Sequence, residues 1–218
     1  EADARHPLEV DLILLAVGSR PNMGDLALDR AGIAHTSTGI TVDAELRTSL
    51  SHVFAIGDVI GPPMLAHKAD YDGVIAARNA VGHAHLRANH RLIPRVTFSD
   101  PELASVGITE ADAVSRGYQV AIGHCRFADL GMARAIGKTL GGVKIVVDAA
   151  TRHMLGIHIL GASADVLINE AALAMRYCRS VGALSEVATI HASPTLSQAL
   201  TRAADDIDEV DTILDRAA

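Results

Sequence analysis

The chain has 218 residues, a length that fits one large domain or two smaller ones of about 100–150 residues each. Hydrophobic residues make up 49% of it and aromatic residues only 3%, so its core has to be built mainly from Ala, Val, Ile and Leu. The net charge of −7 argues against nonspecific binding to nucleic acid, and no apolar run reaches the ~18–20 residues that a membrane span needs.

The first third of the chain alternates apolar runs with turn sequences. The predicted elements, in chain order, are a buried strand at 7–17, a short helix at 24–33, a strand, turn and strand at 39–50, a second buried strand at 52–58 and a helix at 65–82. The first strand ends at Gly18, and Gly82 is a typical residue just after a helix. Polar ligands gather where buried strands of an open α/β sheet end, so Asp58 is a candidate for binding ligand hydroxyl groups.

A polar, His-rich stretch at 83–94, closed by a proline, predicts a domain boundary. Beyond it the patterns predict strands at 95–100, 102–109, 118–127, 141–149 and 153–160, and helices at 109–117, 163–182 and 195–217. Thr109 and Asp112 have the spacing of a capping box for the first of these helices. In the last helix one apolar stripe recurs at spacings of three and four, formed by Leu196, Leu200, Ala203, Ile207, Val210 and Leu214.

Other candidate sites are weak. Cys125 and Cys178 form no CxxC motif, and we interpret them as buried thiols in a reducing, cytoplasmic protein, since no signal peptide is visible in residues 1–10. His83, His85 and His90 have no cysteine or acid at ligand spacing, so no metal site is predicted. The sequence contains no GxGxxG motif and no P-loop, and it therefore lacks the usual cradle for dinucleotide phosphates.

The sequence resembles the second half of the flavin-dependent pyridine nucleotide–disulfide oxidoreductases, and within them the dihydrolipoamide dehydrogenases. Five stretches carry the resemblance in order: "LLAVGSRPN", "VFAIGDVIGPPMLAHKADYDG", "VTFSDPELASVGITEADA", "GGVKIVVDAATRHMLGIHILGASADVLINEAALAM" and "HASPTLSQAL". Together they span nearly the whole chain, so the resemblance is more specific than any single motif.

The resemblance implies a domain layout. Residues 1–18 would be the tail of an NAD-binding domain, residues 19–91 the C-terminal part of an FAD-binding domain, and residues 92–218 an interface domain that builds a homodimer. The implied fold class is α+β, with an antiparallel interface sheet flanked by helices and preceded by a partial α/β FAD-binding domain. Association of the whole protein with a 2-oxo acid dehydrogenase complex is implied as well.

The resemblance also implies site residues. Gly18 would border the nicotinamide cofactor, and Asp58 would bind the ribityl chain of FAD; the residues lining the isoalloxazine would be Met64, Leu65, Ala66 and His67. The family's GxGxxG flavin fingerprint and its redox-active cysteine pair would lie upstream of this sequence. The chain, which starts with Glu1 rather than Met, is therefore expected to be a piece of an FAD- and NAD(P)-dependent enzyme, to bind no cofactor tightly and to be inactive alone.

The stretch "HASPTLSQ" departs from the family's H-x-H-P-T-x-x-E. The catalytic His position holds Ser193 and the position of its orienting Glu holds Gln198, so neither is expected to act as a base, because a serine hydroxyl does not titrate near neutral pH. His191 lies two residues before the catalytic position and could replace the base only if the loop were re-aimed. Otherwise Ser193 is a suitable helix cap, and Thr195 with Gln198 an alternative capping box.

Two alternatives to a dihydrolipoamide dehydrogenase stay open. The parent enzyme could be a flavin-dependent NAD(P)H diaphorase, transhydrogenase or metal reductase, because hydride exchange between flavin and nicotinamide does not need the thiol base. Mercuric reductase fits less well, since the chain ends in "LDRAA" without a cysteine pair. The chain could also be a purely structural dimerisation module.

Overall fold

The computed structural model describes residues 7–82 and 85–217, and of residues 208–217 it describes the backbone alone. The chain divides into two compact units, residues 1–88 and residues 89–218. No helix in the described part of the chain is both long and apolar enough to cross a membrane.

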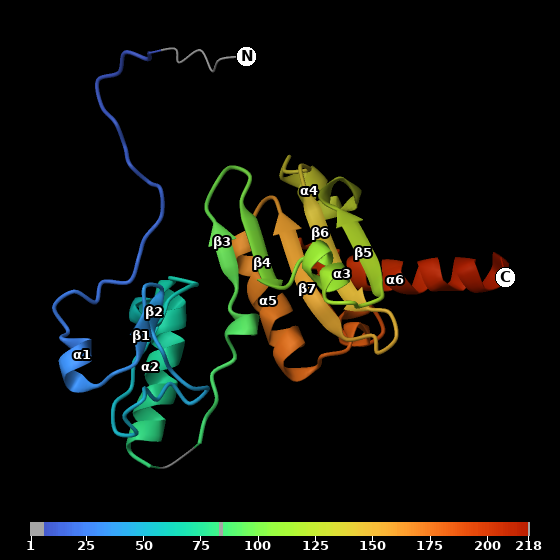
Figure 1. Cartoon of the computed structure of the whole chain (residues 1–218). Coiled ribbons are helices and arrows are strands. Elements are labelled where there is room, and N and C mark those ends of the chain that lie inside the picture. Colours follow the sequence, from blue (N-terminus) through green and yellow to red (C-terminus); the bar gives the residue numbers. More distant parts are fainter. Residues whose placement is uncertain (1–6, 83–84, 218) are drawn as a thin grey trace, which may run out of the picture. The chain divides into compact units, whose positions relative to one another are not determined.

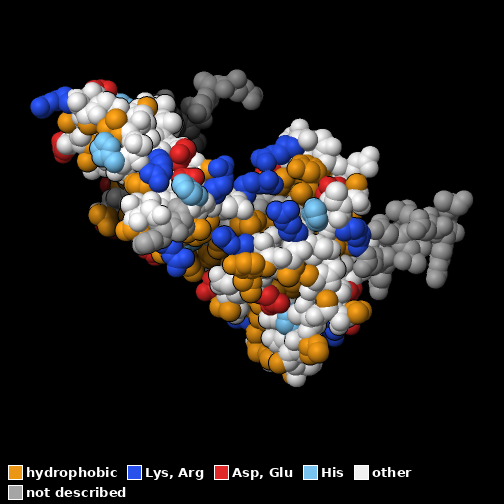
Figure 2. Space-filling model, turned by 90° about the horizontal axis from the view of Figure 1, so that it is seen from below, with side chains coloured by type: hydrophobic (Ala, Val, Ile, Leu, Met, Phe, Trp, Pro, Cys, Tyr) orange, Lys and Arg blue, Asp and Glu red, His pale blue; other side chains and the backbone are white. Residues whose placement is uncertain are grey.

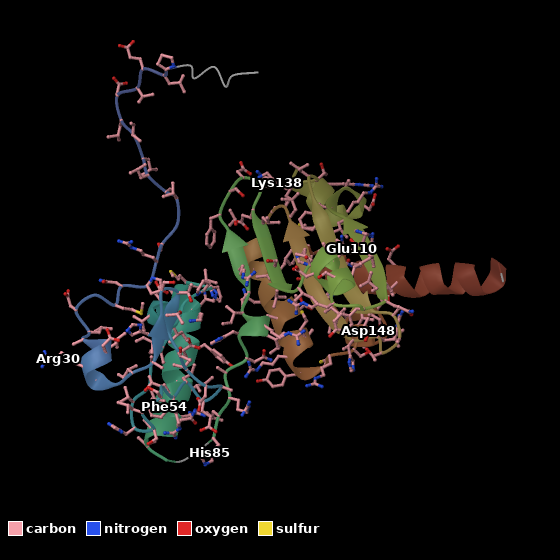
Figure 3. All side chains as sticks on the ribbon, viewed as in Figure 1. Arg30, Phe54, His85, Glu110, Lys138 and Asp148 are labelled. Atoms are coloured by element: carbon pink, nitrogen blue, oxygen red, sulfur yellow. The ribbon has the colours of Figure 1, made fainter. Side chains whose placement is uncertain are left out.

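The first unit is small and loosely built. Its elements are α1 (Leu28–Ala31), the antiparallel strand pair β1 (His35–Thr36) and β2 (Gly39–Ile40), the 3-10 helix η1 (Gly57–Ile60) and α2 (Ala66–Ala80) (Figure 1). Two small apolar clusters hold it together, one around Ile40 and Ala55 and one around Leu46 and Ile75. Phe54 packs on the second cluster beside α2, and the guanidinium of Arg47 covers its ring at 4.6 Å (Figure 3).

Both strands predicted for the first unit's long apolar runs are wrong. Residues 7–17 form no strand, and their large apolar side chains are exposed, for example Leu14 at 86%. A strand needs a neighbour for its backbone N–H and C=O groups, and no described strand pairs with this segment. The run 52–58 pairs only through an isolated bridge between Phe54 and Arg47 and then turns into η1. By contrast, the helix predicted at 65–82 is confirmed as α2.

The second unit contains a five-stranded antiparallel sheet with helices on its faces, as the fold class predicted. Its elements are β3 (Arg95–Thr97), β4 (Leu103–Gly107), α3 (Glu110–Ser115), β5 (Val120–Arg126), α4 (Gly131–Ala135), β6 (Gly142–Asp148), β7 (Met154–Leu160), α5 (Ala164–Tyr177) and α6 (Gln198–Ala217). The strand order is β3-β4-β7-β6-β5, with antiparallel pairing throughout. Three short 3-10 helices, η2 (His90–Leu92), η3 (Phe127–Asp129) and η4 (Val181–Leu184), lie in the connections.

Alternation along β6 explains why both faces of this sheet are covered. Val143, Ile145 and Val147 belong to the main core with α5 and α6, whereas Val146 belongs to a second cluster that includes Ala113 of α3. The register shift between Val146 and Val147 leaves Leu155 of β7 without a partner on β6, so β6 keeps its period of two, and both valines are buried because both faces of the sheet are covered. Figure 1 shows α3 in front of the sheet and α5 behind it.

The start of α3 matches its predicted capping box. The Thr109 hydroxyl accepts the Asp112 N–H, and the Asp112 carboxylate accepts the Thr109 N–H. The Thr109 hydroxyl also donates to that carboxylate, and these hydrogen bonds hold the pKa of Asp112 below its ordinary value. Glu110, labelled in Figure 3, joins the helix to β6 through its ion pair with Lys144.

The last helix packs closely on β5 because β5 carries a glycine there. A Cβ on Gly123 would overlap the carbonyl oxygen of Ala203, so only glycine permits this approach. Asp206 of α6 accepts the His124 N–H of β5 at 2.8 Å. The predicted apolar stripe is confirmed in its first half by the buried Leu196, Leu200, Ala203 and Ile207; Val210 and Leu214 lie outside the described side chains.

Candidate functional site

The turn that carries Asp58 is built from two close backbone contacts in the first unit. Asp58 is in η1, and its side chain is exposed. Cβ atoms on Gly39 and Gly61 would lie 2.7 Å from the Ile60 carbonyl carbon and 2.5 Å from the Thr38 carbonyl oxygen, so glycine lets β2 and η1 approach. The turn is thus fixed by backbone contacts, and it presents the Asp58 carboxylate to its surroundings.

A buried ion pair holds the residue just before Asp58. Lys68 and Asp72, four residues apart on α2, have side chains only 1% and 0% exposed, and Lys68 Nζ lies 3.2 Å from Asp72 Oδ2. Lys68 Nζ also donates to the Gly57 carbonyl at 2.9 Å, while Asp72 accepts the Gly57 N–H at 3.3 Å. Both polar backbone groups of Gly57 are therefore bound by one charged pair, which fastens the Asp58 turn to α2.

This pair was not singled out in the sequence. The spacing of four residues was a usable signal, because opposite charges so placed face one another on a helix. Their burial was not readable, since Lys and Asp are among the residues most often exposed. Only the packing of η1 on α2 shows that their partners include backbone groups.

The residues expected to line a flavin lie at the start of α2. Met64 and Leu65 are half-buried, and Ala66 and His67 are exposed. The Lys68 and Ala69 N–H groups of the first turn donate to the Leu65 carbonyl at 3.0 and 3.1 Å. The helix packs against η1, whose exposed Asp58 carboxylate can accept hydrogen bonds from a ligand rich in hydroxyl groups. Gly18 has a φ of 105°, and a Cβ built there would meet no atom within 4 Å beyond its chain neighbours.

The segment around Ser193 belongs to the second unit and has a different character. Ser193 is exposed, precedes a cis peptide bond to Pro194 and is followed by the start of α6 only at Gln198. The prediction that Ser193 caps this helix is therefore wrong, because the helix starts too late for its side chain to be the cap. The predicted capping box of Thr195 and Gln198 is half formed: the Gln198 side chain accepts the Thr195 N–H at 3.3 Å.

His191 is held through both ring nitrogens. Its Nε2 lies 2.7 Å from Oε1 of Glu170 on α5, and its Nδ1 lies 2.8 Å from Oγ1 of Thr201 on α6. The His191 side chain is 13% exposed, and Thr201 is buried. Because a carboxylate only accepts hydrogen bonds, Nε2 carries a proton and Nδ1 faces the hydroxyl. His191 thus joins the two long helices, and neither nitrogen lone pair is directed outward.

The remaining candidates differ in their surroundings. Cys125 is buried, and burial raises the pKa of its thiol, as fits an inert side chain. Cys178 is exposed, so its prediction as a buried thiol is wrong; it follows the last turn of α5, where the chain leaves the core. His85 contacts Glu45 at 3.3 Å, and His83 lies outside the described residues. Among the described residues no cluster could hold a metal ion.

Comparison with known proteins gives two family matches in chain order. Residues 1–73 match the family described as pyridine nucleotide-disulphide oxidoreductase, and residues 93–204 match the pyridine nucleotide-disulphide oxidoreductase dimerisation domain. Curated relatives include the dihydrolipoyl dehydrogenase of Chlorobaculum tepidum, 43% identical over 94% of this chain, and that of Thermus scotoductus, 41% identical over the same share. The chain spans 44% of the length of these relatives.

Solved structures give the same picture. LpdA from Mycobacterium tuberculosis is similar with a TM-score of 0.80 and 28% identity, over 88% of this chain and 42% of that one. The Cu(II) complex of the HOCl-induced flavoprotein disulfide reductase RclA from Escherichia coli is similar with a TM-score of 0.80 and 28% identity, over 93% of this chain and 46% of the other.

Proposed function

Because the chain belongs to the pyridine nucleotide-disulphide oxidoreductase family, we propose that it is the C-terminal part of a dihydrolipoyl-dehydrogenase-like flavoprotein. The whole protein would pass electrons between a dithiol/disulfide, FAD and NAD(P). The observation that carries this proposal is the 43% identity to a dihydrolipoyl dehydrogenase along 94% of the chain. The proposal includes a cytoplasmic location and a 2-oxo acid dehydrogenase complex as the partner of the whole protein.

The proposed domain layout assigns residues 1–18 to the tail of an NAD-binding domain, 19–91 to an FAD-binding domain and 92–218 to an interface domain. The division into compact units between residues 88 and 89 supports the second boundary. The exposed apolar run at 7–17 supports the first assignment, since a run of this kind suits a strand covered on both faces.

FAD, when bound, would supply the hydride and electron chemistry of the whole protein. In this proposal the Asp58 carboxylate accepts hydrogen bonds from the ribityl hydroxyls, and Met64, Leu65, Ala66 and His67 line the isoalloxazine. The Lys68–Asp72 pair supports this role, because it binds both polar backbone groups of Gly57. Gly18 would border the nicotinamide. The sequence lacks a glycine-rich phosphate loop, so the chain by itself is proposed to hold neither cofactor tightly.

The second unit is proposed to form a homodimer. Apolar side chains reach the surface of the molecule among charged ones (Figure 2). Those of the second unit that are at least 60% exposed include Phe98, Leu140, Val166, Leu173, Val187 and Ile190. We propose that a second copy of the chain covers part of this apolar surface, since contiguous exposed apolar patches mark protein–protein interfaces. Sedimentation of the chain tests this: a colourless dimer is expected, and a strict monomer at high concentration would contradict the interface assignment. If the chain dimerises and the whole protein has no activity, the chain would be a purely structural dimerisation module.

One observation favours a second function for the whole protein, that of a diaphorase, transhydrogenase or metal reductase. Ser193 and Gln198 provide no group that titrates near neutral pH, and both nitrogens of His191 already have partners. Hydride exchange between flavin and nicotinamide needs no thiol base. The similarity to RclA, whose structure contains Cu(II), also supports metal chemistry as a candidate.

The two functions are separated by comparing lipoamide-dependent with ferricyanide-dependent NADH oxidation by the whole protein. We expect ferricyanide reduction to be normal and lipoamide turnover to be weak, because positioned acid–base catalysis contributes about 10²–10⁴-fold. The double variant Ser193→His, Gln198→Glu should raise lipoamide turnover and leave ferricyanide reduction unchanged. Full lipoamide turnover by the unaltered protein would refute the claim that the base is lost, and the single variant Ser193→Ala is the matched control.

A further inference from the structure

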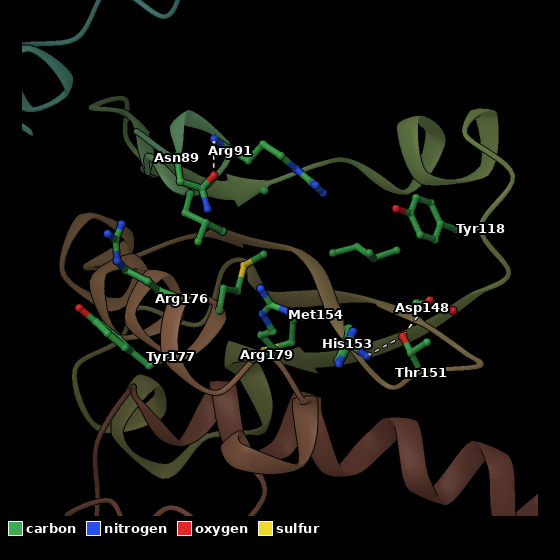
Figure 4. A pocket seen from close by; sticks show the side chains of 14 residues that line it. Asn89, Arg91, Tyr118, Asp148, Thr151, His153, Met154, Arg176, Tyr177 and Arg179 are labelled. Carbon is green, nitrogen blue, oxygen red and sulfur yellow. Dashed lines mark hydrogen bonds between the residues drawn. The ribbon is translucent and has the colours of Figure 1, made fainter. Parts of the chain in front are cut away.

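The second unit has a cavity of about 660 Å³ that none of the proposed site residues lines. This volume lies within the range of about 300–1,000 Å³ that small-molecule sites occupy. The cavity opens between η2, the turn that joins β6 and β7, and the end of α5 (Figure 4). All of its lining residues belong to one compact unit, so the cavity is built without any contribution from residues 1–88.

The base of this cavity is apolar, and its rim is cationic. Met154, Leu155 and Met175 are buried lining residues and supply the apolar surface. The arginines that line the cavity are Arg91, Arg176 and Arg179, and His153 lines it as well. A protein with a net charge of −7 therefore gathers three guanidinium groups around one hollow. An apolar base with a few charged groups at the rim is the usual design of a site for an organic ion.

The orientation of the side chains fits an anion. In Figure 4, Arg91 extends across the cavity toward Tyr118, whose hydroxyl points inward, and Arg179 lies on the opposite wall with His153. Arg176 is positioned over the ring of Tyr177 at 5.9 Å, at the outer end of the cavity. Two guanidinium groups on opposite walls can bind a phosphate from two sides, because each offers planar paired donors.

Asp148 is a carboxylate in the lining, but its oxygens face the β6–β7 turn. Oδ1 accepts the Ala150 N–H at 3.1 Å, and Oδ2 accepts the Thr151 hydroxyl at 2.8 Å. These hydrogen bonds hold the pKa of Asp148 below its ordinary value. Asp148 therefore stays negatively charged. Its carboxylate is hydrogen-bonded within the turn, and the three guanidinium groups outnumber it.

We propose that this cavity binds a nucleoside phosphate, with Arg91 and Arg179 on the phosphate and the base on Tyr118 above the methionine floor. An aromatic ring beside paired guanidinium groups suits a flat base attached to an anion, since bases stack well on aromatic side chains. The site is independent of the proposed electron-transfer function, as it shares no residue with the Asp58 turn or the segment at 191–198.

Calorimetric titration of the 218-residue chain with AMP tests this site, with inorganic phosphate as the second probe. We expect saturable binding of AMP, at least about 10-fold weaker binding of phosphate, and a further loss of about 10–100-fold in Arg91→Ala and Arg179→Ala. The exposed Arg95 lies outside the cavity, so Arg95→Ala should bind AMP as the unaltered chain does. No saturable AMP binding, or equal loss in Arg95→Ala, would overturn the proposal.

The methionines locate the bound ligand independently of affinity. With ¹³C-methyl methionine, AMP should shift the methyl signals of Met154 and Met175 and leave that of Met132 unchanged, because Met132 is not in the cavity lining. The same spectrum without ligand reports whether each arginine variant is folded. Tyr118→Leu should weaken AMP and leave phosphate unaffected. Shifts confined to Met132, or none with bound AMP, would place the ligand elsewhere and refute the assignment.

Discussion

In the Asp58 turn and in the segment at 191–198, a carboxylate pairs with a nitrogen group, an ammonium in the first and an imidazole in the second. The exposed side chain beside the pair differs between the two regions. In the turn, the buried Lys68 and Asp72 pair with each other and bind backbone groups of Gly57, while the neighbouring Asp58 remains exposed. In the segment, the imidazole of His191 contacts Glu170 and Thr201 through its two nitrogens, and the exposed residue nearby is Ser193.

The difference shows that a charged pair supports a site only when it orients a reactive neighbour. Lys68 and Asp72 hold the backbone from which a useful carboxylate projects. Glu170 and Thr201 hold a histidine, and the residue left exposed beside it is a serine without a base. The same type of contact therefore holds an exposed carboxylate in place in the first unit and joins two helices in the second.

The largest effect should come from breaking the buried pair. Lys68→Met removes the ammonium group that pairs with the buried Asp72 carboxylate, and removing one partner of a buried pair costs about 3–5 kcal/mol. Chemical denaturation of the first unit should register this loss. Lys138→Met, at an exposed lysine, is the control and should change stability by less than about 0.5 kcal/mol.

A double variant separates the cost of breaking the buried charge pair from the cost of losing the hydrogen bonds to Gly57. The double change Lys68→Met, Asp72→Leu removes both charges and should recover part of the stability, because apolar replacement of a buried pair is often neutral. Recovery is incomplete because the Gly57 N–H and C=O lose their partners. Equal stability of the single and double variants would show that the pair does not carry the cost.

A smaller loss is expected at His191. His191→Leu removes both hydrogen bonds between α5 and α6 and should lower the free energy of unfolding by about 1–2 kcal/mol, since Glu170 is one-third exposed and can be rehydrated. Thermal unfolding measures it, with the exposed His52→Leu as the control. If His191→Leu instead left stability unchanged, the histidine would not be a structural link, and its imidazole would again be a candidate base.

The smallest effect is a pH dependence of stability caused by His158, a partly buried imidazole. Burial lowers the pKa of His158 below its ordinary 6.5, and the nearby Lys144 charge lowers it further, while the hydrogen bond to the Ile108 carbonyl opposes both. Below about pH 6.5 the unfolded chain binds a proton that the folded chain does not, so stability falls as the pH falls.

Denaturation of the unaltered chain and of His158→Gln between pH 5 and 8 measures this contribution. The difference between the two proteins should change with pH only below about 6.5. A His158→Gln curve that runs parallel to that of the unaltered chain would show that the folded and unfolded states bind this proton equally.

The sequence by itself determined the local elements of the second unit. Alternation and helical spacing located its five strands, α3 and both long helices, and Thr109 with Asp112 located a helix start to the residue, because these signals depend only on neighbours along the chain. The net charge argued against nonspecific binding to nucleic acid, and the ordered motifs indicated the family. The replacement of the family's His and Glu by Ser193 and Gln198 was readable as well.

The tertiary structure decided what depends on partners far apart in the chain. The apolar run at 7–17 has the pattern of a strand but no described neighbour to pair with, and 52–58 becomes a turn. Lys68 and Asp72 are buried because Gly57 meets them, and His191 is occupied because Glu170, 21 residues away, reaches it. Backbone pairing and the desolvation of charge depend on contacts across the fold, and no local sequence pattern specifies these contacts.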